Sequence, residues 1–281
     1  MSAYRVFTDS TSDLTPELIE KLDLSVIPME FTIEEKTYFH YADEREIGFH
    51  EFYEKVRAGS PATTAQVSPA RFHEAFAPTL AAGEDILYLL FSSGLSGMAN
   101  SAHMAAQELM EEYPERRVVV VDTLSASMGE GLLVYDTVMQ KRAGKSLDEV
   151  AQWAEENKLR LCHWFTVDDL NHLRRGGRLS PTAAFVGTLL GIKPVLHVDD
   201  EGHLIPVEKV RGRKQSLNAL VDHMAETCEH PEEQMIFISH GDAPEDAQYV
   251  ADQVRERFQI KDLTINFIGP VVGAHSGPGT V

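Results

Sequence analysis

The chain has 281 residues, enough for two domains or for one large domain with a substantial core. Its 43% of apolar and 25% of charged residues are typical of a water-soluble globular protein. A formal net charge of −19 argues against binding to nucleic acid or to anionic lipid, and no apolar run is long enough to span a bilayer.

The residue types that form disulfides and metal sites show no organised spacing. Cys162 and Cys228 are far apart, and the twelve histidines include no H-E-x-x-H motif. We therefore predict no disulfide scaffold, no metal site and no cofactor. The N-terminus runs directly into a strand-like segment without a signal-peptide core, so we expect a cytoplasmic protein.

The first half of the chain alternates strand and helix patterns. Expected strands are residues 5–8, 24–28, 31–39 (a strand or a hairpin arm), 86–91 and 117–121. Expected helices start at the capped sites 15–16 and 68–69 and cover 49–57, 98–110, 126–142 and 147–157. Residues 59–67 are expected to form a loop. Strands that alternate with helices predict a mostly parallel sheet with helices on both faces.

The pattern changes near residue 160, which predicts an N-terminal α/β domain over 1–160 and a C-terminal, mixed-sheet α/β domain over 161–281. The second part is expected to contain a strand at 161–167, a short helix at 169–173 and an apolar helix at 180–190. A hairpin follows, with arms at 194–198 and 203–210 around the turn 199–202. Helix, strand, helix and strand are then expected at 215–227, 235–240, 244–258 and 263–268.

A small-residue loop follows the most apolar strand. Residues 86–91 are apolar throughout, and the segment S-S-G-L-S-G at 92–97 leads into a helix. Such a loop presents free N–H groups and hydroxyls at the positive end of a helix, where a phosphate or carboxylate binds readily. Ordinary helix capping explains the same residues. No Lys-Ser or Lys-Thr follows the glycines, and the glycines around Ser96 lack the spacing of a nucleophile elbow, so an anion site is favoured over a nucleophilic serine.

Two further features point to an anionic ligand. Polar residues follow three expected strands, at 9–10, 92–97 and 122–125, and ligands of parallel sheets bind at the carboxyl ends of strands. Asp9 and Ser10 lie either near the site or cap the following turn. Between Arg174 and Lys214 there are eight basic and four acidic residues, so this window is net positive in an acidic chain. It forms either scattered ion pairs or a basic surface for an anionic ligand or an acidic partner.

Six segments, in the order and at the spacing of a known family, cover essentially the whole chain and carry a resemblance to it. They are T-D-S-T-S-D at 8–13, T-A-Q-V-S-P at 64–69, S-S-G-L-S-G at 92–97, L-R-R-G-G-R-L at 173–179, I-K-P at 192–194, and G-P at 269–270 leading to H-S-G-P-G at 275–279. Together they resemble the DegV family of bacterial lipid-binding proteins.

The resemblance implies two α/β domains with a long-chain fatty acid, such as palmitate, bound non-covalently between them. It implies that Thr64 and Ser96 hold the carboxylate and that His275 lies in the same site. Some family members present the fatty acid to a kinase that makes an acyl phosphate for phospholipid synthesis. In these the basic residues at the positions of Arg178 and Arg211 handle the phosphate or dock the partner; here both are equally well explained as structural ion-pair partners.

This assignment is physically reasonable. A carboxylate removed from water needs several hydrogen bonds or a cation, and two hydroxyls, a backbone N–H near Gly97 and an imidazole supply them. Each buried methylene contributes roughly 0.8 kcal/mol, so the tail dominates the affinity and the head group fixes the orientation. Apolar side chains of 183–192 are candidates for the tunnel wall, although core packing explains each of them as well.

The sequence departs from the family pattern in two places. The usual T-S-Q-P loop reads T-A-Q-V at 64–67, with one hydroxyl and one proline fewer. The chain also stops at 279–281, where family members run on through a short apolar segment. Loss of that strand is expected to weaken the second domain or to leave His275 mobile.

We therefore expect a cytoplasmic carrier without turnover of its own, which delivers a fatty acid to a fatty-acid kinase and neither binds nucleic acid nor inserts stably into a membrane. The alternative is an enzyme that transfers a phosphoryl or acyl group on a small anion with the same Ser, Thr and His side chains. A lipid-sensing regulator would share the site. The sequence does not specify the acyl chain length, the oligomeric state or the kinase.

Overall fold

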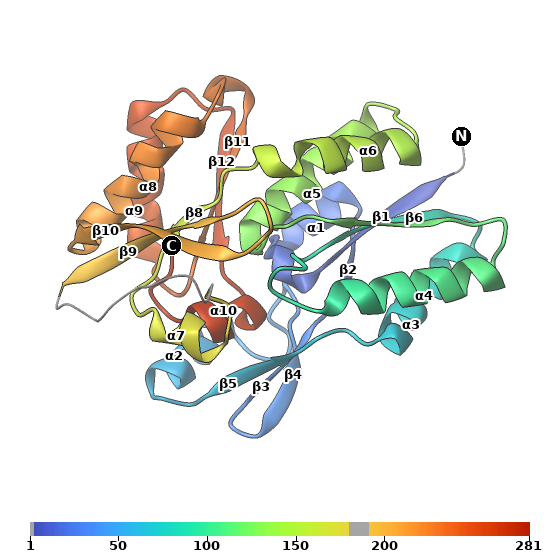
Figure 1. Cartoon of the computed structure of the whole chain (residues 1–281), viewed down its shortest axis with the longest axis horizontal. Coiled ribbons are helices and arrows are strands. Elements are labelled where there is room, and N and C mark those ends of the chain that lie inside the picture. The colour runs from blue at the N-terminus through green and yellow to red at the C-terminus, as the bar shows by residue number, and fades with distance from the viewer. Residues whose placement is uncertain (1–2, 180–190) are drawn as a thin grey trace.

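A computed structural model of the chain describes residues 3–179 and 191–281 (Figure 1). The largest sheet is parallel, with the strand order β2 (Ser25–Ile27), β1 (Tyr4–Asp9), β6 (Asp85–Leu90) and β7 (Val118–Asp122). This confirms the parallel sheet expected from the alternating pattern. Among the described residues, no helix is both long enough and apolar enough to cross a bilayer.

Helices cover both faces of this sheet, because the side chains of its central strand alternate between two buried clusters. Ile86, Tyr88 and Leu90 pack with α3 (Pro69–Ala81) and α4 (Met98–Glu112), whereas Leu87 and Leu89 face the other way. The second face is covered by α1 (Pro16–Leu22), α5 (Ser127–Arg142) and α6 (Leu147–Asn157) (Figure 1). A two-sided apolar strand thus becomes the centre of a three-layer unit.

A small antiparallel sheet lies below, with the order β4 (Lys36–Phe39), β3 (Glu30–Ile33), β5 (Ala62–Ala65), next to α2 (Phe49–Arg57). Its first two strands form a hairpin whose turn residues Glu34 and Glu35 both have positive φ, which suits the twist of paired strands. The prediction of a loop at 59–67 is wrong in part, since residues 62–65 form a strand. Its β-branched Thr63 and Thr64 pair with the free edge of β3, although Gly59 and Pro61 made the segment resemble a loop.

The second half of the chain contains two more sheets. One is antiparallel, with the order β10 (Leu204–Arg211), β9 (Ile192–Val198), β8 (Trp164–Thr166), and the other is the parallel pair β11 (Met235–His240) and β12 (Asp262–Phe267). The β9–β10 hairpin occurs where the sequence predicted it. Helices α7 (Asn171–Arg175), α8 (Arg213–Thr227) and α9 (Pro244–Arg257) complete this half. The apolar helix expected at 180–190 lies outside the described residues.

The last helix, α10 (Pro270–Ser276), was not expected, because its glycines and its polar surroundings favour a loop. Pro270 in its first turn and Gly277 just after its end are the boundary signals that mark it as a helix. The chain then ends between two strands. Val281 exchanges backbone hydrogen bonds with Thr166 of β8, at 2.8 and 3.0 Å, and Gly241 after β11 donates to the carbonyl of Thr280.

Helix α10 packs against the first half of the chain rather than against the strands that precede it. Tyr53 of α2, which is fully buried, donates its hydroxyl to the Ile268 carbonyl at 2.7 Å, and Val271 joins the cluster built around β6. The division into 1–160 and 161–281 therefore stays a prediction, and the end of the second segment contacts the first.

We expect Tyr53→Phe to lower the free energy of unfolding by about 1–3 kcal/mol, because it leaves the buried Ile268 carbonyl without a donor. Urea denaturation monitored by circular dichroism measures this. Tyr38→Phe is the matched control, since Tyr38 is also buried and stacks on Phe31. Equal stabilities of the two variants would contradict the proposed anchoring of α10.

Candidate functional site

A cavity of about 1110 Å³ lies between the two halves of the chain. This is slightly larger than most small-molecule sites, which occupy roughly 300–1,000 Å³. Its wall comes from segments far apart in sequence, namely β5, the loop after β6, the start of α5, the end of α6, β8, α8, β11 and α10. Most of the side chains on this wall are apolar, so the cavity suits a ligand with a large apolar surface.

One part of the wall is polar and contains the residues singled out by the sequence. Thr64, Ser96, Gly97, Arg178 and His275 all line the cavity. The hydroxyl oxygen of Thr64, on the edge strand β5, lies 2.8 Å from Nε2 of His275 on α10. The structure thus brings together residues more than 200 positions apart in the chain.

The loop at 92–97 is held in place by the β9–β10 hairpin. The Ser92 hydroxyl donates to the Gly202 carbonyl at 2.8 Å and accepts from the N–H of Gly94. A Cβ atom on Gly94 would lie 2.7 Å from the carbonyl oxygen of Glu201, so only glycine allows this close approach. The Ser96 hydroxyl accepts from the N–H of Met98 at 3.4 Å, a contact two residues along the chain, whereas the N-cap of α4 is Gly97, which has no side chain to cap this helix.

Arg178 supplies the positive charge at this part of the wall. Its Nε donates to the Leu95 carbonyl at 3.2 Å, and its guanidinium also bonds the Gly176 carbonyl. The side chain therefore connects α7 with the loop at 92–97. Arg211, by contrast, is exposed on β10 opposite Ile192 and is not part of the cavity wall.

The imidazole of His275 is neutral at pH 7. Burial lowers its pKa to about 4, and the nearby positive charge of Arg178 adds to this effect. A neutral ring, two hydroxyls and one guanidinium together match a single negative charge, as on a carboxylate.

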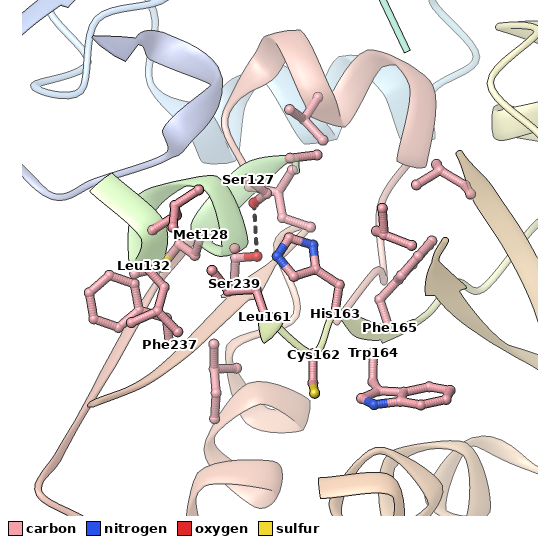
Figure 2. A pocket seen from close by; sticks show the side chains of 18 of the residues that line it. Ser127, Met128, Leu132, Leu161, Cys162, His163, Trp164, Phe165, Phe237 and Ser239 are labelled. Carbon is pink, nitrogen blue, oxygen red and sulfur yellow. Dashed lines mark hydrogen bonds between the residues drawn. The ribbon is translucent and has the colours of Figure 1, made fainter. Parts of the chain in front are cut away.

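The apolar wall comes from segments that the sequence analysis did not single out. It is built mainly by α5, β8, α8 and β11, with Met128, Leu132, Phe165 and Phe237 among its side chains (Figure 2). Both tryptophans, Trp153 and Trp164, also line the cavity. Of the predicted lining at 183–192, residues 183–190 lie outside the described part of the chain and Ile192 is not on the wall. Periodicity alone does not separate such residues from ordinary core.

Two other clusters of ionisable residues lie outside the cavity wall. Asp9 caps the turn after β1 and accepts hydrogen bonds from the Thr11 N–H, the Tyr88 hydroxyl and the Phe91 N–H, which supports its reading as a cap. His50, Glu54 and Asp242 lie close together on the surface, where Arg57 bonds both carboxylates. In each cluster the protein itself provides the partners of the charged groups.

These features define the class of protein. It is an α/β protein with a largely apolar cavity, and a group of polar side chains on the cavity wall matches an anion. The sequence profile of the DegV family, described as a family of uncharacterised proteins, matches residues 3–281, and the chain belongs to this family.

Relatives agree in sequence and fold. A DegV domain-containing protein of Clostridium perfringens is 45% identical over 281 residues, covering 100% of this chain and 96% of the relative. A DegV family protein of Thermus thermophilus, described as fatty-acid binding, is 31% identical with a TM-score of 0.89, and the match covers 100% of this chain and 97% of that one. A Ruminococcus gnavus family member described with vaccenic acid is 27% identical with a TM-score of 0.89, covering 100% and 98% of the two chains.

We expect His275 to make the protein less stable as the pH falls from about 6.5 to about 4. In this window the unfolded imidazole binds a proton that the folded one does not. His275→Asn should therefore lose less unfolding free energy than the wild type over the same range. Urea denaturation at stepped pH measures this, with His103→Asn, an exposed residue of α4, as the control. Parallel pH profiles for wild type and His275→Asn would contradict it.

Proposed function

We propose that this protein binds one long-chain fatty acid, such as palmitate, non-covalently in the cavity. The observation that carries the proposal is the polar group of Thr64, Ser96, Arg178 and His275 on the wall of a large apolar cavity. An amphiphile with one carboxylate and a long alkyl tail matches this combination. The fatty-acid binding described for the Thermus family member and the vaccenic acid named for the Ruminococcus one support the same ligand class.

In this proposal the carboxylate accepts hydrogen bonds from the hydroxyls of Thr64 and Ser96 and from the N–H of Gly97, and lies next to His275 and Arg178. The tail occupies the apolar part of the cavity. At roughly 0.8 kcal/mol per buried methylene, a palmitate tail contributes on the order of 10 kcal/mol before the costs of binding. The tail therefore sets the affinity, and the polar group sets the direction in which the acid lies.

The contact between Thr64 and His275 also has the geometry of a nucleophile and its base, which favours a second candidate, an enzyme that transfers a phosphoryl or acyl group. A pKa near 4 makes the imidazole a weak base at neutral pH, so we prefer the carrier without turnover. Recovery of unmodified acid after prolonged incubation with a nucleoside triphosphate, and of unmodified protein after incubation with an acyl thioester, supports the carrier. A phosphorylated acid or an acylated protein, with release of the nucleoside diphosphate or the thiol, would favour the enzyme.

Mass spectrometry of lipid extracted from the purified protein, combined with native mass, tests the first proposal. We expect one fatty acid per chain. Protein that stays empty after incubation with palmitate and with vaccenic acid would contradict it.

Removing either hydroxyl is expected to weaken palmitate binding about tenfold, because a hydrogen bond to a charged group is lost. Thr64→Ala and Ser96→Ala test this by isothermal titration calorimetry on delipidated protein. Thr64→Ser and Ser96→Thr keep the hydroxyls and should stay close to the wild type. Wild-type affinity in both alanine variants would remove these residues from the site.

We further propose that the protein acts in the cytoplasm and presents its fatty acid to a fatty-acid kinase, with Arg178 next to the carboxylate and Arg211 on the exposed surface. The basic window from Arg174 to Lys214 suits an acidic face of such a partner.

Arg211→Ala is expected to slow acyl-phosphate formation several-fold in a reconstituted kinase assay, while the affinity for palmitate stays the same, because Arg211 lies outside the cavity wall. Arg255→Ala, an exposed arginine of α9, is the matched control. Equal rates for the two variants would exclude Arg211 from the partner surface.

A further inference from the structure

A chain of hydrogen bonds ends on the wall of the cavity. The Ser127 hydroxyl at the start of α5 lies 2.6 Å from Oδ2 of Asp13 and 2.9 Å from the hydroxyl of Ser239 on β11. Ser127 and Ser239 both line the cavity, and their contact is visible in Figure 2. Asp13 lies behind them, with a fully buried side chain.

This arrangement is built by three separate segments. Oδ1 of Asp13 accepts from the N–H of Gly269, and Asn266 of β12 donates to the Asp13 carbonyl at 2.7 Å. Ser127 has a φ of +51°, a conformation that serine seldom adopts, and it directs the hydroxyl toward this network. The network therefore fixes the position of both serine hydroxyls.

The hydroxyl of Ser239 keeps one hydrogen-bonding function free toward the cavity. Each serine has one proton to donate. When Asp13 is ionised, Ser127 donates to it, Ser239 donates to Ser127, and Ser239 is left as an acceptor. When Asp13 carries a proton, the direction reverses and Ser239 is left as a donor. Within the described residues, Ser127 is the hydrogen-bond partner of Ser239.

An imidazole lies beside it. The ring of His163 packs with Nε2 against Gly129, where a Cβ atom would clash with it, so only glycine fits there. Nε2 is already buried and so does not face the cavity. Figure 2 shows the imidazole next to the Ser127–Ser239 pair, on the same wall of the cavity.

A plain alkyl chain does not match this hydroxyl. Apolar side chains line the wall around it, including Met128, Leu132, Leu161 and Phe237 (Figure 2). A methylene placed against Ser239 excludes water from the remaining hydrogen-bonding function of the hydroxyl and leaves that function unmatched, which costs free energy. A polar group on the ligand at this depth removes the cost.

We propose that Ser239, supported by Ser127 and Asp13, forms a second recognition point that selects a fatty acid with a hydroxyl group on its chain. This inference rests on the proposed function, because the carboxylate must lie at Thr64 and Ser96 for the chain to pass this point. A hydroxyl both donates and accepts, so it satisfies Ser239 in either direction of the network. A keto group only accepts, and a double bond does neither.

The test compares stearic acid with a series of hydroxystearic acids that differ only in the position of the hydroxyl group, by competition for delipidated protein. We expect one of these positional isomers to bind about tenfold more tightly than stearic acid, because a well-placed hydrogen bond in a buried site contributes about that much. In Ser239→Ala this preference should disappear, so that the ratio of the two affinities falls about tenfold.

Ser96→Ala is the matched contrast, because it should weaken stearic acid and every isomer by the same factor and leave their ratio unchanged. If Ser239→Ala fails to fold, Ser239→Cys replaces it, since a thiol has a similar shape and is a weak hydrogen-bond partner. Circular dichroism establishes folding in each case.

The outcomes separate the two proposals. If neither stearic acid nor any isomer binds, the proposed function fails. If stearic acid binds and every hydroxy isomer binds more weakly, the recognition point is wrong and a trapped water satisfies Ser239. A preferred isomer whose advantage survives in both Ser239 variants would also overturn the inference.

Discussion

The packing of α10 against the first half of the chain is the constraint on which the cavity depends. Tyr53 bonds the carbonyl just before this helix, Asp13 bonds the N–H of Gly269, and Thr64 contacts His275 near the end of the helix. These contacts connect three distant segments of the first half to a single short helix. Without them, the polar group and the apolar wall would not face the same space.

The site separates two physical tasks. Apolar burial provides most of the free energy and is insensitive to direction, whereas hydrogen bonds and one guanidinium decide which end of a ligand lies where. The low pKa of His275 keeps the ring uncharged, so Arg178 is the positive group next to the hydroxyls. An acid bound there is balanced by a charge that the protein does not lose on mild acidification.

Much of the fold could be predicted from the sequence, because its signals are local. The apolar run at 86–91, the caps before α1 and α3, and the turn at 199–202 each fix a nearby element. Strand β5 and helix α10 were missed because tertiary pairing decides them: Thr64 becomes a strand residue only where β3 offers a free edge. The family motifs located Thr64, Ser96, Arg178 and His275, but the network of Asp13, Ser127 and Ser239 has no local pattern that points to it.

Both tryptophans of the chain, Trp153 and Trp164, lie on the cavity wall, and the indole of Trp164 is stacked between the rings of His197 and His223. All of the indole fluorescence of this protein therefore originates next to the cavity. Filling or emptying it changes the polarity around the emitting rings directly. The protein thus contains its own optical reporter of occupancy, which needs neither a label nor an added dye.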